Sequence, residues 1–157
     1  MMDALILAAA LGWQFETAAD PLGQPVYVAS VTPDHGRPFV SLKYSCGGIV
    51  GVVLQFNLGD VKYASMQFST KEPEYETVRF SFAEGNYDTT AKRSPITDGL
   101  ATYEIKGSEA AFVASLLKDS DNVTITRGRV SFSFPLTGAR FAIDEVSNAC
   151  PFKYPDQ

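Results

Sequence analysis

Apolar and polar residues alternate with a period of two along most of the chain, a pattern typical of β-strands with one buried face. The alternation is clearest in four segments, residues 39–46, 50–56, 77–82 and 130–134. Less regular stretches of the same kind occupy residues 13–17, 26–32, 61–68, 100–105 and 123–126. Short strands with one polar face predict a mainly β (β-rich α+β) fold, an antiparallel β-sandwich or partly open barrel of about eight to nine strands.

Two segments depart from this period and predict amphipathic helices. Residues 108–118 place their large apolar side chains on one side, and Ser108 follows a glycine as a candidate N-cap. Residues 137–149 carry a second apolar stripe, and the hydroxyl of Thr137 is the candidate cap there. We therefore expect two helices near 108–118 and 137–149.

Length and charge limit the classes of function. The 157 residues match one domain, residues 13–157, because domains usually contain about 100–200 residues. The net charge of −5 has the wrong sign for a surface that neutralises phosphates, so we expect no nucleic-acid partner. No segment reaches the ~18–20 apolar residues of a membrane-spanning helix, so we expect no integral membrane segment.

The N-terminal segment supports two interpretations. Residues 4–11 form an apolar run, and Ala8 and Ala10 have the small-x-small spacing of a signal-peptide cleavage site. No Lys or Arg precedes the run, and Asp3 is acidic where a signal peptide is basic. Residues 1–12 are thus either a signal segment or an N-terminal helix or strand packed on the core. The first predicts a periplasmic or secreted protein, the second a cytoplasmic one.

The two cysteines, Cys46 and Cys150, lie too far apart in sequence for a local CxxC redox or zinc motif. Cys46 has the parity of the buried positions in its predicted strand, and Cys150 follows the apolar stripe of the second helix. Both sulfur atoms therefore point inward. They form either a disulfide, favoured in an oxidising compartment, or two separate buried thiols.

No catalytic or metal-binding motif is recognisable. His35 is the only histidine and lies in a predicted turn, and no GxSxG or HExxH sequence occurs. Residues 119–122 begin like a calcium loop but lack its glycine and glutamate, and predict a turn after the first helix. The glutamates of residues 72–76 fit an acidic edge strand better than an acid–base pair. We therefore predict a protein that is not an enzyme and needs no cofactor or metal.

The polar stretch of residues 84–98 contains no apolar run and predicts an exposed loop or a hairpin tip. Its candidate contact residues are Asn86, Tyr87, Lys92 and Arg93. In a protein-interaction module this loop would contact a protein partner. In the alternative, a carrier of a small apolar ligand, the same loop would act as the lid of an aromatic interior.

Arg127 and Arg129 flank Gly128 between two predicted strands. Two guanidinium groups around a glycine are a candidate contact for a phosphate or carboxylate. The alternative is a charged hairpin turn.

Several short motifs occur in a characteristic order: Trp13, the Asp-Pro-Leu of residues 20–22, the strand of residues 41–46 that ends in cysteine, and the Phe-Pro-Leu-Thr-Gly of residues 134–138 before a helix that ends in Cys150. The order resembles the VasI/TagO-like family of small exported proteins associated with bacterial type VI secretion. Ser45 stands where that family usually has arginine. The resemblance implies a periplasmic, non-enzymatic accessory protein of the cell envelope, with Cys46 and Cys150 bridged, acting on a protein partner.

Overall fold

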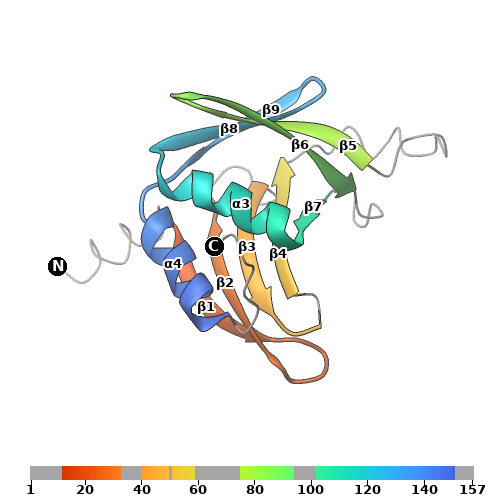
Figure 1. The fold of residues 1–157 in the computed structure, drawn as a ribbon, viewed down its shortest axis with the longest axis vertical. Coiled ribbons are helices and arrows are strands. Elements are labelled where there is room, and N and C mark those ends of the chain that lie inside the picture. Colours follow the sequence, from red (N-terminus) through yellow and green to blue (C-terminus); the bar gives the residue numbers. More distant parts are fainter. Residues whose placement is uncertain (1–11, 33–39, 50, 59–74, 94–101, 151–157) are drawn as a thin grey trace.

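The computed structural model describes residues 12–32, 40–49, 51–58, 75–93 and 102–150. These residues form nine strands and two helices (Figure 1). In chain order the elements are β1 (Gln14–Ala19), β2 (Pro25–Val31), β3 (Val40–Gly47), β4 (Gly51–Leu58), β5 (Tyr75–Phe82), β6 (Gly85–Arg93), β7 (Tyr103–Lys106), α3 (Gly107–Lys118), β8 (Asn122–Arg127), β9 (Val130–Pro135) and α4 (Ala139–Ala149).

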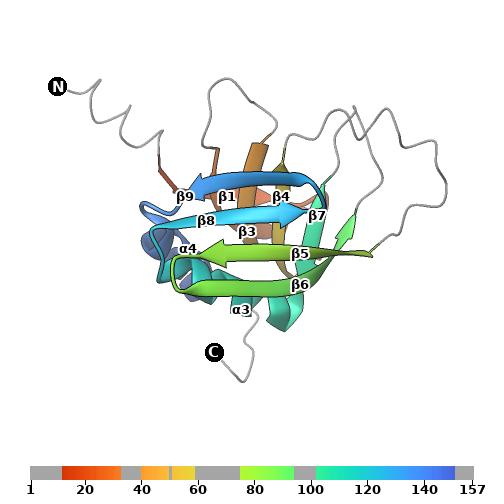
Figure 2. The same ribbon diagram turned by 90° about the horizontal axis from the view of Figure 1, so that it is seen from above.

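All nine strands belong to one antiparallel sheet in the order β1-β2-β3-β4-β7-β6-β5-β8-β9. The sheet is strongly bent, so that β5, β6, β8 and β9 run across β1–β4 (Figures 1 and 2). The two edges meet at one corner: the backbone N–H of Trp13 donates to the Thr137 carbonyl (3.1 Å), and its indole N–H donates to the Pro135 carbonyl (3.0 Å). The mainly β prediction is confirmed, as one open antiparallel sheet.

The core lies on the inner face of the bend. Phe56 of β4 packs edge-on against Phe80 of β5, with ring centroids 5.8 Å apart, and stacks on Tyr103 of β7 at 5.4 Å. All three side chains are fully buried. Because β4 and β5 belong to different halves of the sheet, these rings join the halves through side-chain packing.

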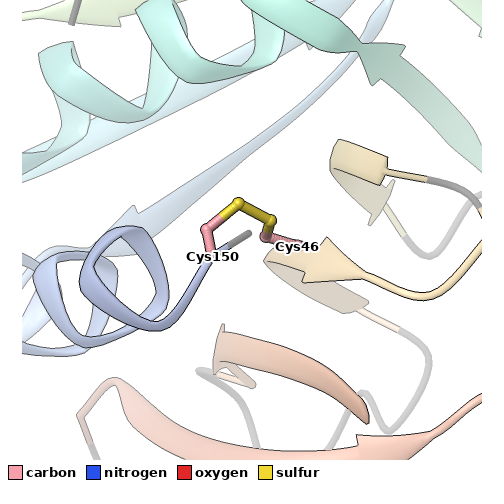
Figure 3. Close-up of a disulfide and its surroundings, with 2 residues drawn as sticks. All are labelled: Cys46 and Cys150. Atoms are coloured by element: carbon pink, nitrogen blue, oxygen red, sulfur yellow. A yellow bond between two sulfur atoms is a disulfide. The ribbon is translucent and has the colours of Figure 1, made fainter. Parts of the chain in front are cut away.

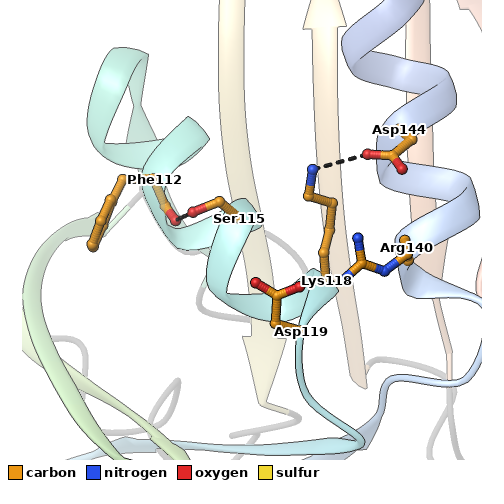
Figure 4. A network of polar contacts seen from close by, with 6 residues as sticks. All are labelled: Phe112, Ser115, Lys118, Asp119, Arg140 and Asp144. Carbon is orange, nitrogen blue, oxygen red and sulfur yellow. Dashed lines mark hydrogen bonds and ion pairs between the residues drawn. The ribbon is translucent and has the colours of Figure 1, made fainter. Parts of the chain in front are cut away.

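The two helices lie on this inner side of β1–β4, and α4 packs on β1, β2 and β3 (Figure 1). Two ion pairs connect the helices: Lys118 Nζ lies 2.9 Å from Asp144, and Arg140 pairs with Asp119 (Figure 4). In the same view the Ser115 hydroxyl bonds back to the Phe112 carbonyl within α3. None of the helices in the described ranges has both the length and the apolar character needed to cross a membrane.

The predicted helices are present, but their predicted caps are wrong. Neither Ser108 nor Thr137 makes a side-chain capping bond. The chain enters α3 through Gly107 at φ 69°, so Ser108 already lies within the first turn. Gly138, at φ 79°, is the N-cap of α4, and the Trp13 carbonyl is 3.6 Å from where its Cβ would be. This contact leaves room for a Cβ, so it is the left-handed backbone that favours glycine at this cap.

The cysteines form a disulfide, which excludes the two-thiol alternative (Figure 3). Cys46 is buried in β3, and Cys150 is the C-cap of α4. The bridge joins positions 104 residues apart and fixes the end of α4 to the inner face of the sheet. The predictions for residues 1–11, His35, the strand 61–68 and the glutamates at 72 and 74 lie outside the described residues.

Candidate interaction surfaces

The interpretation of residues 84–98 as a loop is wrong for residues 85–93, which form β6. β6 pairs with β5 along its length and with β7 at Lys92 and Arg93. Residues 85–93 are therefore a paired strand of the sheet and not a free loop. Residues 94–98 lie outside the described part of the chain.

The four contact residues predicted on β6 lie on two different faces. Tyr87 and Arg93 share the inward parity of the fully buried Ala91, whereas Asn86 and Lys92 have the outward parity. The structure therefore does not bring them together as one surface. That these four residues contact a protein partner remains a prediction, and they would have to do so from two different faces of β6.

Tyr87 has a structural partner on α3. Its hydroxyl donates to Glu109 Oε1 at 2.5 Å, and the Thr89 hydroxyl donates to the same oxygen at 2.8 Å. The Tyr87 ring packs against Phe112 at 5.1 Å. The bond to the Glu109 carboxylate, together with burial and the nearby negative charge, raises the pKa of Tyr87 to about 12. This contact holds α3 against β6.

The outer side of the β5–β6 hairpin carries a paired charge. Arg79 donates to both carboxylate oxygens of Asp88, at 2.7 and 3.0 Å, and both side chains are about half exposed. The pair raises the pKa of Arg79 and lowers the pKa of Asp88, through the hydrogen bonds first and the opposite charge second. The two charges are opposite, so the pair adds no net charge to this face.

The two arginines of the predicted anion contact also separate. Arg127 lies inside the bend: it is 3.8 Å from Glu76 Oε1, and its guanidinium lies 5.5 Å from the centre of the Tyr103 ring. Its side chain is 11% exposed. Arg129 is exposed in the β8–β9 turn, which confirms the hairpin interpretation. Arg127 therefore contacts a carboxylate of its own chain, and the two arginines do not form one clamp.

A site that the sequence analysis missed lies where the β1–β2 and β3–β4 turns meet, at the lower end of the sheet in Figure 1. Asp20 Oδ1 accepts from the backbone N–H groups of Leu22 (2.9 Å) and Gln24 (2.8 Å) in its own turn. Its Oδ2 accepts from the N–H of Ile49 in the other turn at 3.2 Å. We call residues 20–24 and 47–49 the two-turn tip.

Glycines allow the two turns to approach. A Cβ on Gly47 would lie 2.4 Å from the Pro25 carbonyl oxygen, and one on Gly48 would lie 2.7 Å from Asp20 Oδ2. Both residues have positive φ, 126° and 63°, as does Gly23 at 80°. A side chain at Gly47 would therefore press on the β2 backbone at Pro25, and one at Gly48 on the Asp20 carboxylate.

The two-turn tip presents aliphatic side chains on a rigid polar support. Leu22 is 69% exposed and Ile49 66%, whereas the amides beneath them bond to Asp20. Asp20 is the only charged residue of the tip, and its two oxygens accept three hydrogen bonds. Such a tip can lose water at little cost to its backbone. The Asp-x-x-Gly and Gly-Gly sequences indicate two separate turns, but no sequence signal indicates that they meet.

Comparison with solved structures finds a similar fold. The chain resembles the crystal structure of invasion associated protein B from Bartonella henselae, with a TM-score of 0.54 and 12% sequence identity. The alignment covers 87% of this chain and 90% of that chain. At this identity the likeness shows the fold alone. No protein-family model and no curated protein matches the sequence.

Proposed function

We propose that this protein is an exported, non-enzymatic interaction module of the bacterial cell envelope that contacts a protein partner through the two-turn tip. The observation that carries the proposal is the position of Asp20. Its carboxylate holds Leu22 and Ile49, from turns far apart in sequence, as two exposed aliphatic groups on one support.

The tip has the properties of a small contact centre. Burial of a Leu or Ile side chain contributes about 1.5–3 kcal/mol each, so both together can anchor a partner. Rigid turns lose little conformational entropy on binding. The tip contains no Lys or Arg, which anionic lipid surfaces attract. We therefore propose an uncharged apolar recess of a protein as the partner surface.

The disulfide supports export. Stable bridges form mainly in oxidising compartments, such as the bacterial periplasm. The finer assignment, association with type VI secretion, rests on the sequence resemblance described above and remains part of the proposal.

The contact is tested by placing a photo-crosslinking amino acid at position 22 or 49 in the native host, with position 90 on the outer face of β6 as control. We expect one protein to crosslink from 22 and 49 and not from 90. With the crosslinker at position 22, Ile49→Asp should lose that product, and with the crosslinker at position 49, Leu22→Asp should lose it, while the free energy of unfolding of each variant stays within about 0.5 kcal/mol. Equal crosslinking from position 90, or an unchanged product in both Asp variants, would exclude the tip.

Export is tested separately by the intact mass of the protein purified from its native host, alkylated with and without prior reduction. A shortened N-terminus and alkylation only after reduction are expected of an exported protein. A full-length chain with two reactive thiols would contradict export. It would not affect the proposed contact through the tip, which the crosslinking experiment tests separately. Loss of secretion activity in a deletion strain, restored by the wild-type gene, would test the type VI association.

A further inference from the structure

The strand β1 is one end of the sheet order, and no strand among the described residues pairs with its other side. Five of its six residues are exposed. It contains no Lys, Arg or Pro, and Glu16 is its only charged residue. Natural proteins usually protect an edge strand with such residues or with a bulge. The register with β2 runs without a bulge from Gln14 to Ala19, so within the described residues this edge carries none of these protections beyond Trp13, which bonds to the carbonyls of Pro135 and Thr137.

The hydrogen bonds show which backbone groups point away from β2. The N–H of Asp20 donates to the Gln24 carbonyl at 2.9 Å, and this pair continues the β1–β2 register. Because bonded and non-bonded pairs alternate in an antiparallel ladder, Ala18 and Glu16 also bond to β2. The N–H and C=O groups of Phe15, Thr17 and Ala19 therefore point to the outer edge.

We propose that β1 pairs with β1 of a second copy of this chain, antiparallel about a two-fold axis at Thr17. Such an axis is perpendicular to the sheet and keeps each face on the same side, so residues of equal parity stand opposite each other. With Thr17 opposite Thr17, Phe15 faces Ala19 and Glu16 faces Ala18. Each large side chain meets a small one, and the outward backbone groups of Phe15, Thr17 and Ala19 meet in bonded pairs.

The two registers shifted by one residue are less favourable. An axis at residue 16 would place Glu16 opposite Glu16, an axis at residue 18 would place Glu16 opposite Asp20, and like charges directly opposite each other are destabilising. The opposite edge of the sheet is also less suited. The bond from the Leu136 N–H to the Asp121 carbonyl (3.0 Å) puts Ser131, Ser133 and Pro135 outward on β9, and Pro135 has no N–H to donate.

This pairing does not depend on the proposed function, but it would extend it. Because paired strands run in opposite directions, the two-turn tips of the two copies would lie at opposite ends of the joined sheet. The dimer would present two contact sites facing different ways. An edge of this length buries less surface than standard interfaces, so the association should be weak and depend on concentration.

The test is sedimentation equilibrium of the full chain over a range of concentrations, for the wild type, Thr17→Pro and Ser131→Pro. Both prolines replace outward-facing edge residues, which tolerate proline in a monomer. We expect the wild type to dimerise, Thr17→Pro to lower the association constant at least about tenfold, and Ser131→Pro to match the wild type. A wild type that stays monomeric, or equal effects of both prolines, would overturn the proposal.

A second variant gives a readout that is independent of folding differences. Opposed residues of a bonded pair have Cα atoms about 5.5 Å apart, within the range that a disulfide spans. Both native cysteines are bridged, so Thr17→Cys adds a single thiol. Mild oxidation should convert Thr17→Cys to a covalent dimer and leave Ser131→Cys monomeric. Equal yields from the two variants would contradict pairing at Thr17.

Discussion

Asp20 and Ile49, 29 residues apart, are joined by a hydrogen bond of 3.2 Å from the Ile49 backbone N–H to the second carboxylate oxygen of Asp20. The first oxygen of the same carboxylate organises the turn that carries Leu22. One side chain thus fixes the position of one hairpin turn relative to another. This relation makes the two-turn tip a defined surface rather than two separate loops.

The substitution Asp20→Asn should remove the hydrogen bond from Ile49 selectively. The amide oxygen can still accept from Leu22 and Gln24, but an NH2 group replaces the oxygen that accepts from Ile49. We expect the free energy of unfolding to fall by about 0.5–1.5 kcal/mol in urea denaturation. Gly48→Ala should disturb the same contact, because its Cβ would lie 2.7 Å from Oδ2. If the two effects are strictly additive in the double variant, they do not act on one contact.

Removal of the bridge with Cys46→Ala/Cys150→Ala should destabilise the fold strongly. The bridge joins residues 104 positions apart, and the loss of this constraint on the unfolded chain costs about 3–5 kcal/mol in a chain-entropy estimate. Guanidinium denaturation measures the contribution of the bridge to stability when the wild type and the double variant are each unfolded with and without reductant. Reductant should lower the stability of the wild type and leave the double variant unchanged. An unchanged wild type after verified reduction would show that packing of α4 alone suffices.

The Tyr87–Glu109 bond predicts a loss of stability at high pH. The hydrogen bond to Glu109, and after it burial, raise the pKa of Tyr87 from 10.0 to about 12. A raised pKa means that the neutral phenol is favoured in the folded state. The resulting stability is complete below pH 10 and is lost as the pH rises through about 12.

The measurement is tyrosinate absorbance against pH, together with unfolding free energies at several pH values. Tyr87→Phe should remove a phenol that titrates near pH 12 and lower stability near neutral pH by about 1–2 kcal/mol. Its stability should then fall less steeply between pH 10 and 12 than that of the wild type. Tyr27, also partly buried, provides the control Tyr27→Phe. A wild-type titration without a late phenol would contradict the contact.

Arg127 and Arg129 should respond differently to the same substitution. Arg127→Ala removes a mostly buried cation that lies beside Glu76 and over the Tyr103 ring. We therefore expect the free energy of unfolding to fall by about 1–3 kcal/mol. Arg129→Ala alters an exposed turn and should stay within about 0.5 kcal/mol. Thermal or urea unfolding distinguishes them. Equal effects would show that the environment of Arg127 does not govern its contribution.

The alternation of apolar and polar residues correctly predicted β3 and β9, because every second residue of these strands faces the core. It failed for β6, and the structure gives the reason. The inward residues Tyr87 and Thr89 contact the carboxylate of Glu109 on α3 instead of an apolar core. Both faces of the strand are therefore polar in sequence, and the strand resembles a loop.

The sequence by itself determined the mainly β class, the two helices and the inward direction of Cys46 and Cys150. These features follow from local periodicity, because side-chain direction repeats every two residues in a strand and every 3.6 in a helix. Tertiary structure alone decided that Asp20 meets Ile49, that Arg127 is buried while Arg129 is not, and that β1 is an edge. Those relations depend on strand order and on register between distant segments, which pairing and packing fix only when the whole sheet assembles.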